Sequence, residues 1–249
     1  MFKAHLFDFY SANAVSILFF VNLVGLQAFY IIIKTTMKRI TLILTFILIT
    51  ILVFGQEQRL KPARNFKNYE GLLQEYYNSI FPLLYKGYSE KPIARYTSMP
   101  SFFSEYSFSV ETMKGKNYVV SNKMSQNFWY AKKRKNVKLR SSKVELNNDL
   151  YTKIVELFEL LTEQTKKPKD ELAGIGVDGV TYYFATTDKN GTINIGETWS
   201  PDDDSLLERL VQICDNIYSL GNGYNVSQTD LLKDIDRLLN NLLLSNVEG

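Results

Sequence analysis

The side chains of this chain that could serve catalysis include a group of carboxylates and a single cysteine. Asp178, Glu197 and Asp202–Asp204 fall in the C-terminal half, together with the single cysteine, Cys214. The single histidine is His5. Because the sequence holds no histidine after that position, catalytic Ser-His and Cys-His pairs and histidine-ligated zinc sites are excluded for the body of the protein. An enzyme built on this body would depend on carboxylates, lysine, tyrosine or a Ser-Lys pair.

The carboxylates do not form a recognisable catalytic pattern. Pairs of acids serve glycosidases, and Asp178, Glu197 and Asp202 could converge in a fold, but no spacing singles them out. Ser200-Pro201 before Asp202–Asp204 is typical of a helix start, with Ser200 as the N-cap and proline at the first helical position. Acids in a first helical turn stabilise the helix by about 0.3–1 kcal/mol each, and we favour this role over a metal site. The sequence thus predicts no catalytic residue, no metal ligand and no cofactor.

Two glycine-containing runs resemble ligand-binding motifs. Gly174 to Gly179 matches G-x-G-x-x-G, but a dinucleotide site needs a helix after the motif, and Val180 to Thr186 is the densest β-forming run in the chain. We predict a strand that ends in an Asp178-Gly179 turn. Asp188 to Asn194 resembles a calcium loop but lacks the glycine and the terminal acid that such a loop requires. A hairpin turn with a left-handed Gly191 is predicted there.

The best candidate for binding is an aromatic run followed by a basic one. Aromatic side chains beside cations can stack on sugars or bases and hold phosphates. The more frequent structural alternative is a solvated hairpin tip whose aromatic residues face the core. The candidate binding residues are Phe128, Trp129, Tyr130, Lys132, Lys133, Arg134 and Lys135.

Charge is distributed unevenly along the chain. The net charge is +3 overall. Residues 56–145 carry 17 basic and 7 acidic residues, whereas residues 146–249 carry 8 basic and 18 acidic ones. The favoured interpretation is that the two halves of one domain attract each other. The alternative is a basic face for an anionic partner, namely lipid headgroups or acidic glycan, with nucleic acid not favoured.

The first 55 residues are almost entirely apolar and divide into two stretches. Ala14–Ile33 has 20 residues and is just long enough to span a bilayer. Ile40–Phe54 has 15 residues, follows Lys38-Arg39 and precedes Gly55-Gln56, which is the arrangement of a secretory signal peptide.

Two accounts of this leader remain open. In the preferred one, translation begins at Met37 and residues 1–36 are an over-extended start. In the other, both stretches insert as a helical hairpin whose basic turn lies in the cytoplasm. Either account places the body in the cell envelope, periplasmic or extracellular, and either secreted or anchored at its N-terminus. The expected divisions are a hydrophobic segment at 1–36, a signal peptide or second transmembrane helix at 37–55, a tether at 56–68 and a single domain at 69–249.

Hydrophobic periodicity predicts an α+β fold for that domain. We expect an antiparallel sheet, made of two hairpin or meander groups, packed against helices on one face. The expected elements are a helix over 69–84, a loop over 87–103, a hairpin of 106–113 with 118–124, a second hairpin of 128–132 with 137–144, a helix over 147–164, strands between 172 and 199, a helix from 200 to 220 and a last helix from 227 or 229 to 244. Cys214 falls among apolar positions and is predicted to be a small core residue.

Three features resemble an uncharacterised family of exported bacterial domains: the signal-like segment, Asp178-Gly-Val-Thr-Tyr-Tyr-Phe184 and Thr198-Trp-Ser-Pro201. The resemblance implies export but no activity, and so no site residue is transferred. We therefore expect a non-catalytic envelope module that contacts another envelope protein or an anionic surface, with membrane contact through the N-terminal segment. The alternatives are a carboxylate-dependent hydrolase acting on glycan or peptide, and a purely structural subunit.

Overall fold

The computed structural model describes residues 37–41, 59–63, 71–165 and 178–247. The chain divides into two compact units, Met1–Gln56 and Glu57–Gly249. In the first unit only one helical turn, at 37–41, is described, so the long apolar stretch at 14–33 and the expected cleavage point lie outside the described residues. None of the helices in the described ranges has both the length and the apolar character needed to cross a bilayer.

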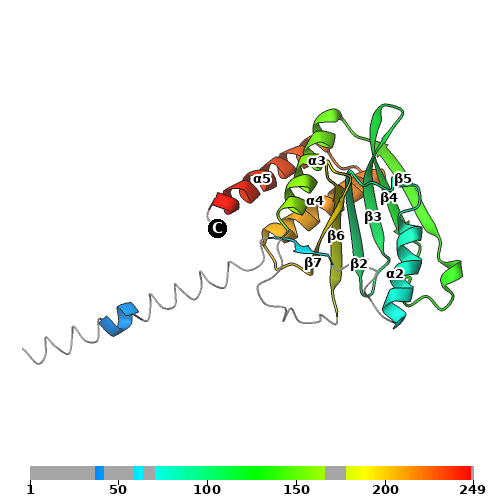
Figure 1. The fold of residues 1–249 in the computed structure, drawn as a ribbon, viewed down its shortest axis with the longest axis horizontal. Helices are drawn as coiled ribbons and strands as arrows, with labels where there is room; N and C mark the ends of the chain where they lie inside the picture. Colours follow the sequence, from blue (N-terminus) through cyan, green and yellow to red (C-terminus); the bar gives the residue numbers. More distant parts are fainter. Residues whose placement is uncertain (1–36, 42–58, 64–70, 166–177, 248–249) are drawn as a thin grey trace, which may run out of the picture. The chain divides into compact units, whose positions relative to one another are not determined.

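The second unit is built on a seven-stranded antiparallel sheet in the order β1-β7-β6-β2-β3-β4-β5 (Figure 1). The predicted fold class, an α+β protein with an antiparallel sheet packed against helices, is confirmed. The strands are β1 (Lys61–Pro62), β2 (Ala94–Pro100), β3 (Tyr106–Met113), β4 (Lys116–Met124), β5 (Leu139–Glu145), β6 (Val180–Thr187) and β7 (Ile193–Trp199).

Helices cover both faces of this sheet, not one face as the sequence predicted. Phe184 and Tyr183 are neighbours on β6 and therefore point to opposite faces. Phe184 belongs to a core formed with α3 (Asn148–Glu163), α4 (Leu206–Gly221) and α5 (Gln228–Val247). Tyr183 belongs to a second core formed with α2 (Gly71–Leu84). Both cores and all strands lie within the unit Glu57–Gly249, which makes this unit self-contained.

Helices α3 and α4 each begin after a polar side chain that accepts a hydrogen bond from a backbone amide of the first turn. Asn147 caps α3, as predicted, by accepting a hydrogen bond from the Leu150 amide at 2.8 Å. The predicted start of α4 at Ser200 is wrong, because Ser205 is the N-cap and accepts from the Glu208 amide at 3.0 Å. The acids at 202–204 therefore lie in the loop before α4 rather than in its first turn.

Two predicted elements differ from the structure. The expected loop at 87–103 contains β2, which is buried along its whole length in the middle of the sheet. Because β2 carries polar residues such as Arg95 and Thr97 on one buried face, its apolar alternation is incomplete. The expected strand at 128–132 is absent from the described sheet, and β5 pairs with β4 instead. Residues 125–138 form a loop that includes one 3-10 turn, Arg134–Asn136.

The segment expected to be a tether contributes to the sheet. Lys61 and Pro62 pair with Glu197 and Gly196 of β7. The Leu60 side chain is buried against Gly196, where a Cβ atom would lie 2.7 Å from Leu60 Cδ1. Gly196 thus provides the space that Leu60 occupies, and the folded body begins before residue 69.

Gly221, in the last turn of α4, lies where that helix approaches β4 closely. A Cβ atom at Gly221 would overlap Ser121 Oγ and lie 3.1 Å from Ser121 Cβ. We expect Gly221→Ala to lower the free energy of unfolding by about 1–3 kcal/mol in urea denaturation, because overpacking displaces β4 from α4. Asn216→Ala, at an exposed position of the same helix, is the control and should change it by less than about 0.5 kcal/mol. Equal stability of the two variants would contradict the close packing.

Candidate functional site

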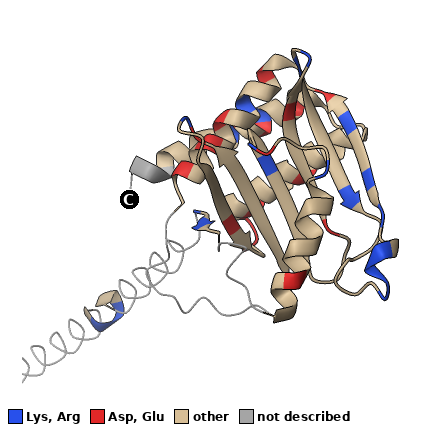
Figure 2. Cartoon of the chain, turned by 45° about the vertical axis from the view of Figure 1, so that its right-hand side comes forward, with Lys and Arg blue, Asp and Glu red and all other residues tan. Residues whose placement is uncertain are grey.

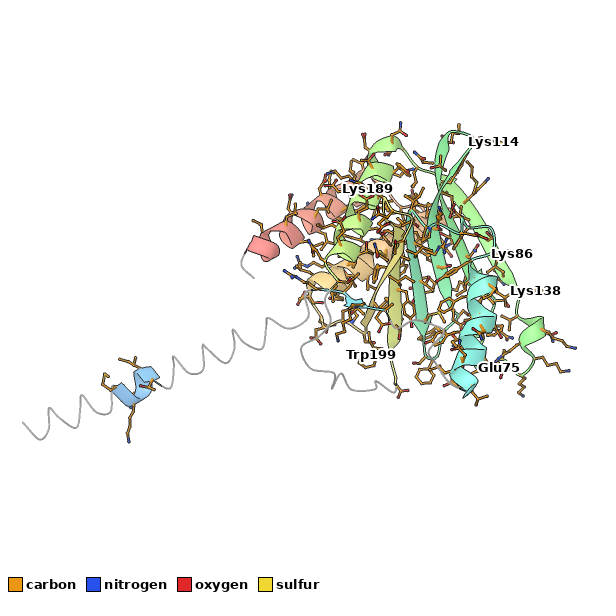
Figure 3. All side chains as sticks on the ribbon, viewed as in Figure 1. Glu75, Lys86, Lys114, Lys138, Lys189 and Trp199 are labelled. Carbon is orange, nitrogen blue, oxygen red and sulfur yellow. The ribbon has the colours of Figure 1, made fainter. Side chains whose placement is uncertain are left out.

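One end of the sheet gathers the loops that carry the candidate binding residues. The pairs Pro100 with Val180, Tyr106 with Lys123, and Met124 with Leu139 all lie at this end. The loops at 101–105, 125–138 and 200–205 therefore meet there. Figure 3 shows Glu75 of α2 and Trp199 of β7 toward this end, and Lys114 and Lys189 toward the opposite one.

Four exposed aromatic residues at this end form what we call the aromatic platform: Phe102, Phe103, Trp129 and Tyr130. Their side chains are 60%, 76%, 37% and 60% exposed, respectively. The rings of Phe102 and Tyr130 stack at 6.1 Å between centroids and 8° between planes. Two loops that are distant in sequence thus present one aromatic surface.

Asn127 connects these two loops. Its side-chain amide nitrogen donates to the carbonyl oxygens of Phe103 at 2.7 Å, Ser101 at 3.3 Å and Pro100 at 3.4 Å. Its amide oxygen accepts from the Tyr130 backbone amide at 3.0 Å. Both ends of the Asn127 amide therefore hold the platform together.

Beneath the platform lies the buried carboxylate of Glu105. It accepts hydrogen bonds from the Tyr76 hydroxyl at 2.8 Å and from the Phe128 backbone amide at 3.0 Å. Burial raises the pKa of Glu105, and these hydrogen bonds partly offset that effect. The Tyr76 ring also contacts Trp129 edge-on, with centroids 5.1 Å apart. Glu105 consequently fixes α2 and the 125–138 loop to each other.

Helix α2 extends the apolar surface beside the platform. Leu72 and Leu73 are 71% and 38% exposed in its first turn. They lie one helical turn before Tyr76 and Tyr77 and so share their faces of the helix. Leu72 therefore adds exposed apolar surface one helical turn from the tyrosine that contacts Trp129.

Exposed cations continue from the platform along the sheet edge. We call this set of six residues the basic strip, and Figure 2 shows the blue Lys and Arg positions of the ribbon along β5 and the adjoining loop. None of the six forms an ion pair with an acid within the described part of the chain. The members are Lys123, Lys132, Lys133, Lys135, Lys138 and Arg140.

The seven residues predicted to bind a ligand thus have different roles. Trp129, Tyr130, Lys132, Lys133 and Lys135 are exposed. Phe128 is only 3% exposed and belongs to the core that α2 covers. The Arg134 guanidinium lies over the Phe128 ring at 5.4 Å and pairs with Glu75 at 3.7 Å. Phe128 and Arg134 therefore hold the loop in place, and the other five residues are available at the surface.

Three ion pairs each join residues of the same half of the body, either the basic residues 56–145 or the acidic residues 146–249. Lys116–Glu145 and Arg134–Glu75 join residues of the basic half. Lys153–Asp236 joins residues of the acidic half. Within the described part of the chain, the basic strip has no carboxylate partner.

The acids named from the sequence occupy exposed or half-exposed positions. Asp178 and Asp202–Asp204 are exposed, and Glu197 is half-buried on β7. Among the described residues, no three or more His, Cys, Asp or Glu side chains are close enough to hold a metal ion. The Asp188 turn is a hairpin turn, as predicted: Asp188 Oδ1 accepts from the Thr192 amide at 2.8 Å, and Gly191 has φ 81°.

Three carboxylates with internal hydrogen bonds were not evident from the sequence. Glu105 and Glu111 are buried, and Glu111, on β3, accepts from the Ser109 hydroxyl at 2.6 Å, whereas Asp215, on α4, is half-buried. Asp215 accepts from the hydroxyls of Tyr106 at 2.7 Å and Tyr96 at 2.9 Å. Spacing in the sequence gives no signal for the cluster of Tyr96, Tyr106 and Asp215, because these residues come from β2, β3 and α4, respectively. Cys214, next to Asp215, is a buried free thiol in the core, as predicted.

Comparisons with protein-family models, curated proteins and solved structures give no match to this chain. The arrangement of these side chains is accordingly the basis for assigning a function.

Tyr76→Phe tests the attachment of the loop to α2. The substitution keeps the ring but removes one of the donors to the buried Glu105 carboxylate. We expect the free energy of unfolding to fall by about 1–3 kcal/mol in urea denaturation. Tyr130→Phe is the matched control, since no described residue bonds its hydroxyl, and it should change stability by less than about 0.5 kcal/mol. A Tyr76→Phe variant as stable as the control would show that the Glu105 contact contributes little.

Asp215→Asn tests how ionisation of Asp215, beside Tyr96 and Tyr106, affects the stability of the fold. Burial raises the pKa of Asp215, so the folded protein binds this proton more tightly than the unfolded chain does. The stabilising contribution of that proton is complete at low pH and is lost as the pH rises through the folded-state pKa. Asparagine keeps the acceptor oxygen and does not ionise. From about pH 4 to about pH 7, the stability of wild type relative to the variant should therefore fall. A constant or rising difference would contradict the burial effect.

Proposed function

We propose that this protein is a non-catalytic cell-envelope module that binds an anionic surface through the basic strip and the aromatic platform. The observation that supports this most directly is the collection of six exposed cations without described carboxylate partners. Lysine and arginine side chains in such a cluster raise the local concentration of anions by their summed field.

The sheet register strengthens this argument. Lys123 on β4 lies directly opposite Arg140 on β5. Like charges at opposed positions of antiparallel strands destabilise the sheet when nothing neutralises them. An anion bound along this edge would remove that repulsion, and so the strip fits a ligand of opposite charge.

The proposal of a non-catalytic role rests on how the buried carboxylates are used. Glu105 accepts a hydrogen bond from Tyr76 of α2, Glu111 from the Ser89 amide, and Asp215 from Tyr106 of β3. Those bonds attach loops, strands and helices to one another, which is a structural use of each acid. The hydrolase alternative depends on Asp178, Glu197 and Asp202, and no feature of their positions adds support to it.

The proposed location follows from the leader. A signal peptide or transmembrane helix before residue 56 would deliver the body to the periplasm or the cell exterior. Anionic lipid headgroups and acidic glycans are the polyanions of those compartments, so the location and the charge of the strip agree.

Dextran sulfate binding by the Glu57–Gly249 unit tests the proposal. We expect affinity to fall as salt rises from about 50 to about 500 mM, because screening weakens contacts between exposed charges. Lys132→Ala/Lys133→Ala/Lys135→Ala should lower the affinity at least about tenfold at the lower salt concentration, by removing half of the strip. Isothermal titration calorimetry measures both effects.

The matched control removes three positive charges elsewhere. Lys189, Lys233 and Arg237 are exposed and lie on the β6–β7 turn and on α5, away from the strip. Their replacement by alanine gives the same net charge and should leave the affinity within about twofold. Salt-independent binding, or equal losses in the two triple variants, would count against a localised basic site.

A further inference from the structure

We propose that the anionic surface is a lipid bilayer, and that the aromatic platform inserts into its interface while the basic strip contacts the headgroups. This inference rests on the proposed function and specifies its ligand. It depends on the platform being adjacent to lysines, mainly apolar, and held in shape before any ligand binds.

The composition of the platform matches a bilayer interface. Tryptophan and tyrosine concentrate at the headgroup level of membranes, and apolar side chains insert just beneath it. Phe102, Phe103, Trp129 and Tyr130 supply the aromatic residues, and Leu72, one helical turn before the Tyr76 that contacts Trp129, adds an exposed aliphatic side chain on α2. Phenylalanine and leucine side chains carry no hydrogen-bonding group, and a bilayer interface takes up their apolar area.

The side-chain amide of the platform is already occupied. A glycan-binding site needs side chains that hydrogen-bond hydroxyl groups, in addition to aromatic rings. Asn127 is the amide side chain between the two loops, and both its nitrogen and its oxygen bond the protein backbone. What remains exposed on the platform is mostly aromatic ring surface, with the Tyr130 hydroxyl as a polar group and cations beside it.

The basic strip begins in the same loop as Trp129 and Tyr130, so its lysines would lie at the level of the lipid headgroups when the platform inserts. Lys132, Lys133 and Lys135 follow Tyr130 directly in the 125–138 loop and are exposed. Long lysine side chains extend along apolar surface and place their ammonium groups among lipid phosphates. Each lysine near an anionic membrane surface strengthens binding roughly fivefold.

The platform is rigid for a loop structure. Asn127 ties residues 100–103 to Tyr130, and Glu105 ties the Phe128 amide to Tyr76 of α2. The Arg134 guanidinium covers the Phe128 and Trp129 rings at 5.4 and 5.9 Å. A surface fixed in this way loses little conformational entropy on binding, so exposed apolar area contributes efficiently to affinity.

The test uses the Glu57–Gly249 unit, which lacks the apolar leader, and vesicles of equal parts phosphatidylglycerol and phosphatidylcholine. The chain has two tryptophans, so Trp199→Phe leaves Trp129 as the only one. We expect Trp129 emission to shift to shorter wavelength when these vesicles are added, and to be quenched by brominated lipid chains. Vesicles of phosphatidylcholine alone should bind at least about tenfold more weakly.

A set of serine variants separates lipid insertion from charge. Phe102→Ser/Phe103→Ser/Tyr130→Ser should weaken vesicle binding about tenfold or more, and leave dextran sulfate binding within about twofold, because only the bilayer takes up apolar area. The matched control, Ile193→Ser/Tyr224→Ser/Leu244→Ser, removes exposed apolar side chains elsewhere and should change neither affinity.

The outcomes distinguish the inference from the function on which it rests. Lysine-dependent vesicle binding without a Trp129 shift and without an effect of the aromatic variant would overturn the bilayer inference and leave the anionic-surface function intact. An aromatic variant that weakens dextran sulfate binding as much as vesicle binding would show stacking on the polyanion and would also overturn it. Failure of the unit to bind either probe would overturn both.

Discussion

The buried carboxylate of Glu105 joins α2 to the 125–138 loop, and the aromatic platform and the basic strip depend on the position of that loop. It accepts from the Tyr76 hydroxyl of α2 and from the Phe128 amide of the 125–138 loop. A buried carboxylate is costly to leave without donors, so this geometry strongly favours one position for the helix and the loop. Because Trp129, Tyr130 and the following lysines belong to that loop, an interior contact fixes the position of the exposed aromatic and basic residues.

The second constraint is that the sheet is covered on both faces. Tyr96 and Phe184 point to the core beneath α3, α4 and α5, whereas Met99 and Tyr183 point to the core beneath α2. The strand β2 lies in the middle and is buried throughout. Burial on both faces lets this strand carry Arg95, whose guanidinium packs on the Tyr85 and Tyr88 rings at 4.6 and 5.3 Å to their centroids. The α2 face is thus the more polar of the two interiors.

The fold also explains the uneven charge of the chain. The basic half contributes α2 and the strands β1 to β5, including the edge strand β5, while the acidic half contributes β6, β7 and the helices α3, α4 and α5. A sheet edge with exposed lysine and arginine resists pairing with other strands, which is a common protection against aggregation. In this protein that edge continues into the aromatic platform, and the combination of the two is what suggests a binding role beyond protection.

The sequence by itself determined the class of the fold, the four helices whose apolar residues recur at helical spacing, the first hairpin, and the absence of histidine chemistry from the body. Each of these depends on local periodicity, local turns or composition, which neighbouring residues in the sequence settle. The exposed part of the candidate site, from Trp129 to Lys135, could also be found in this way. Only the tertiary structure decided that Phe128 and Arg134 hold the loop rather than bind, that Phe102 stacks on Tyr130, and that β2 is a central strand. These features join residues far apart in the chain, and their energies come from packing and buried hydrogen bonds that no local pattern records.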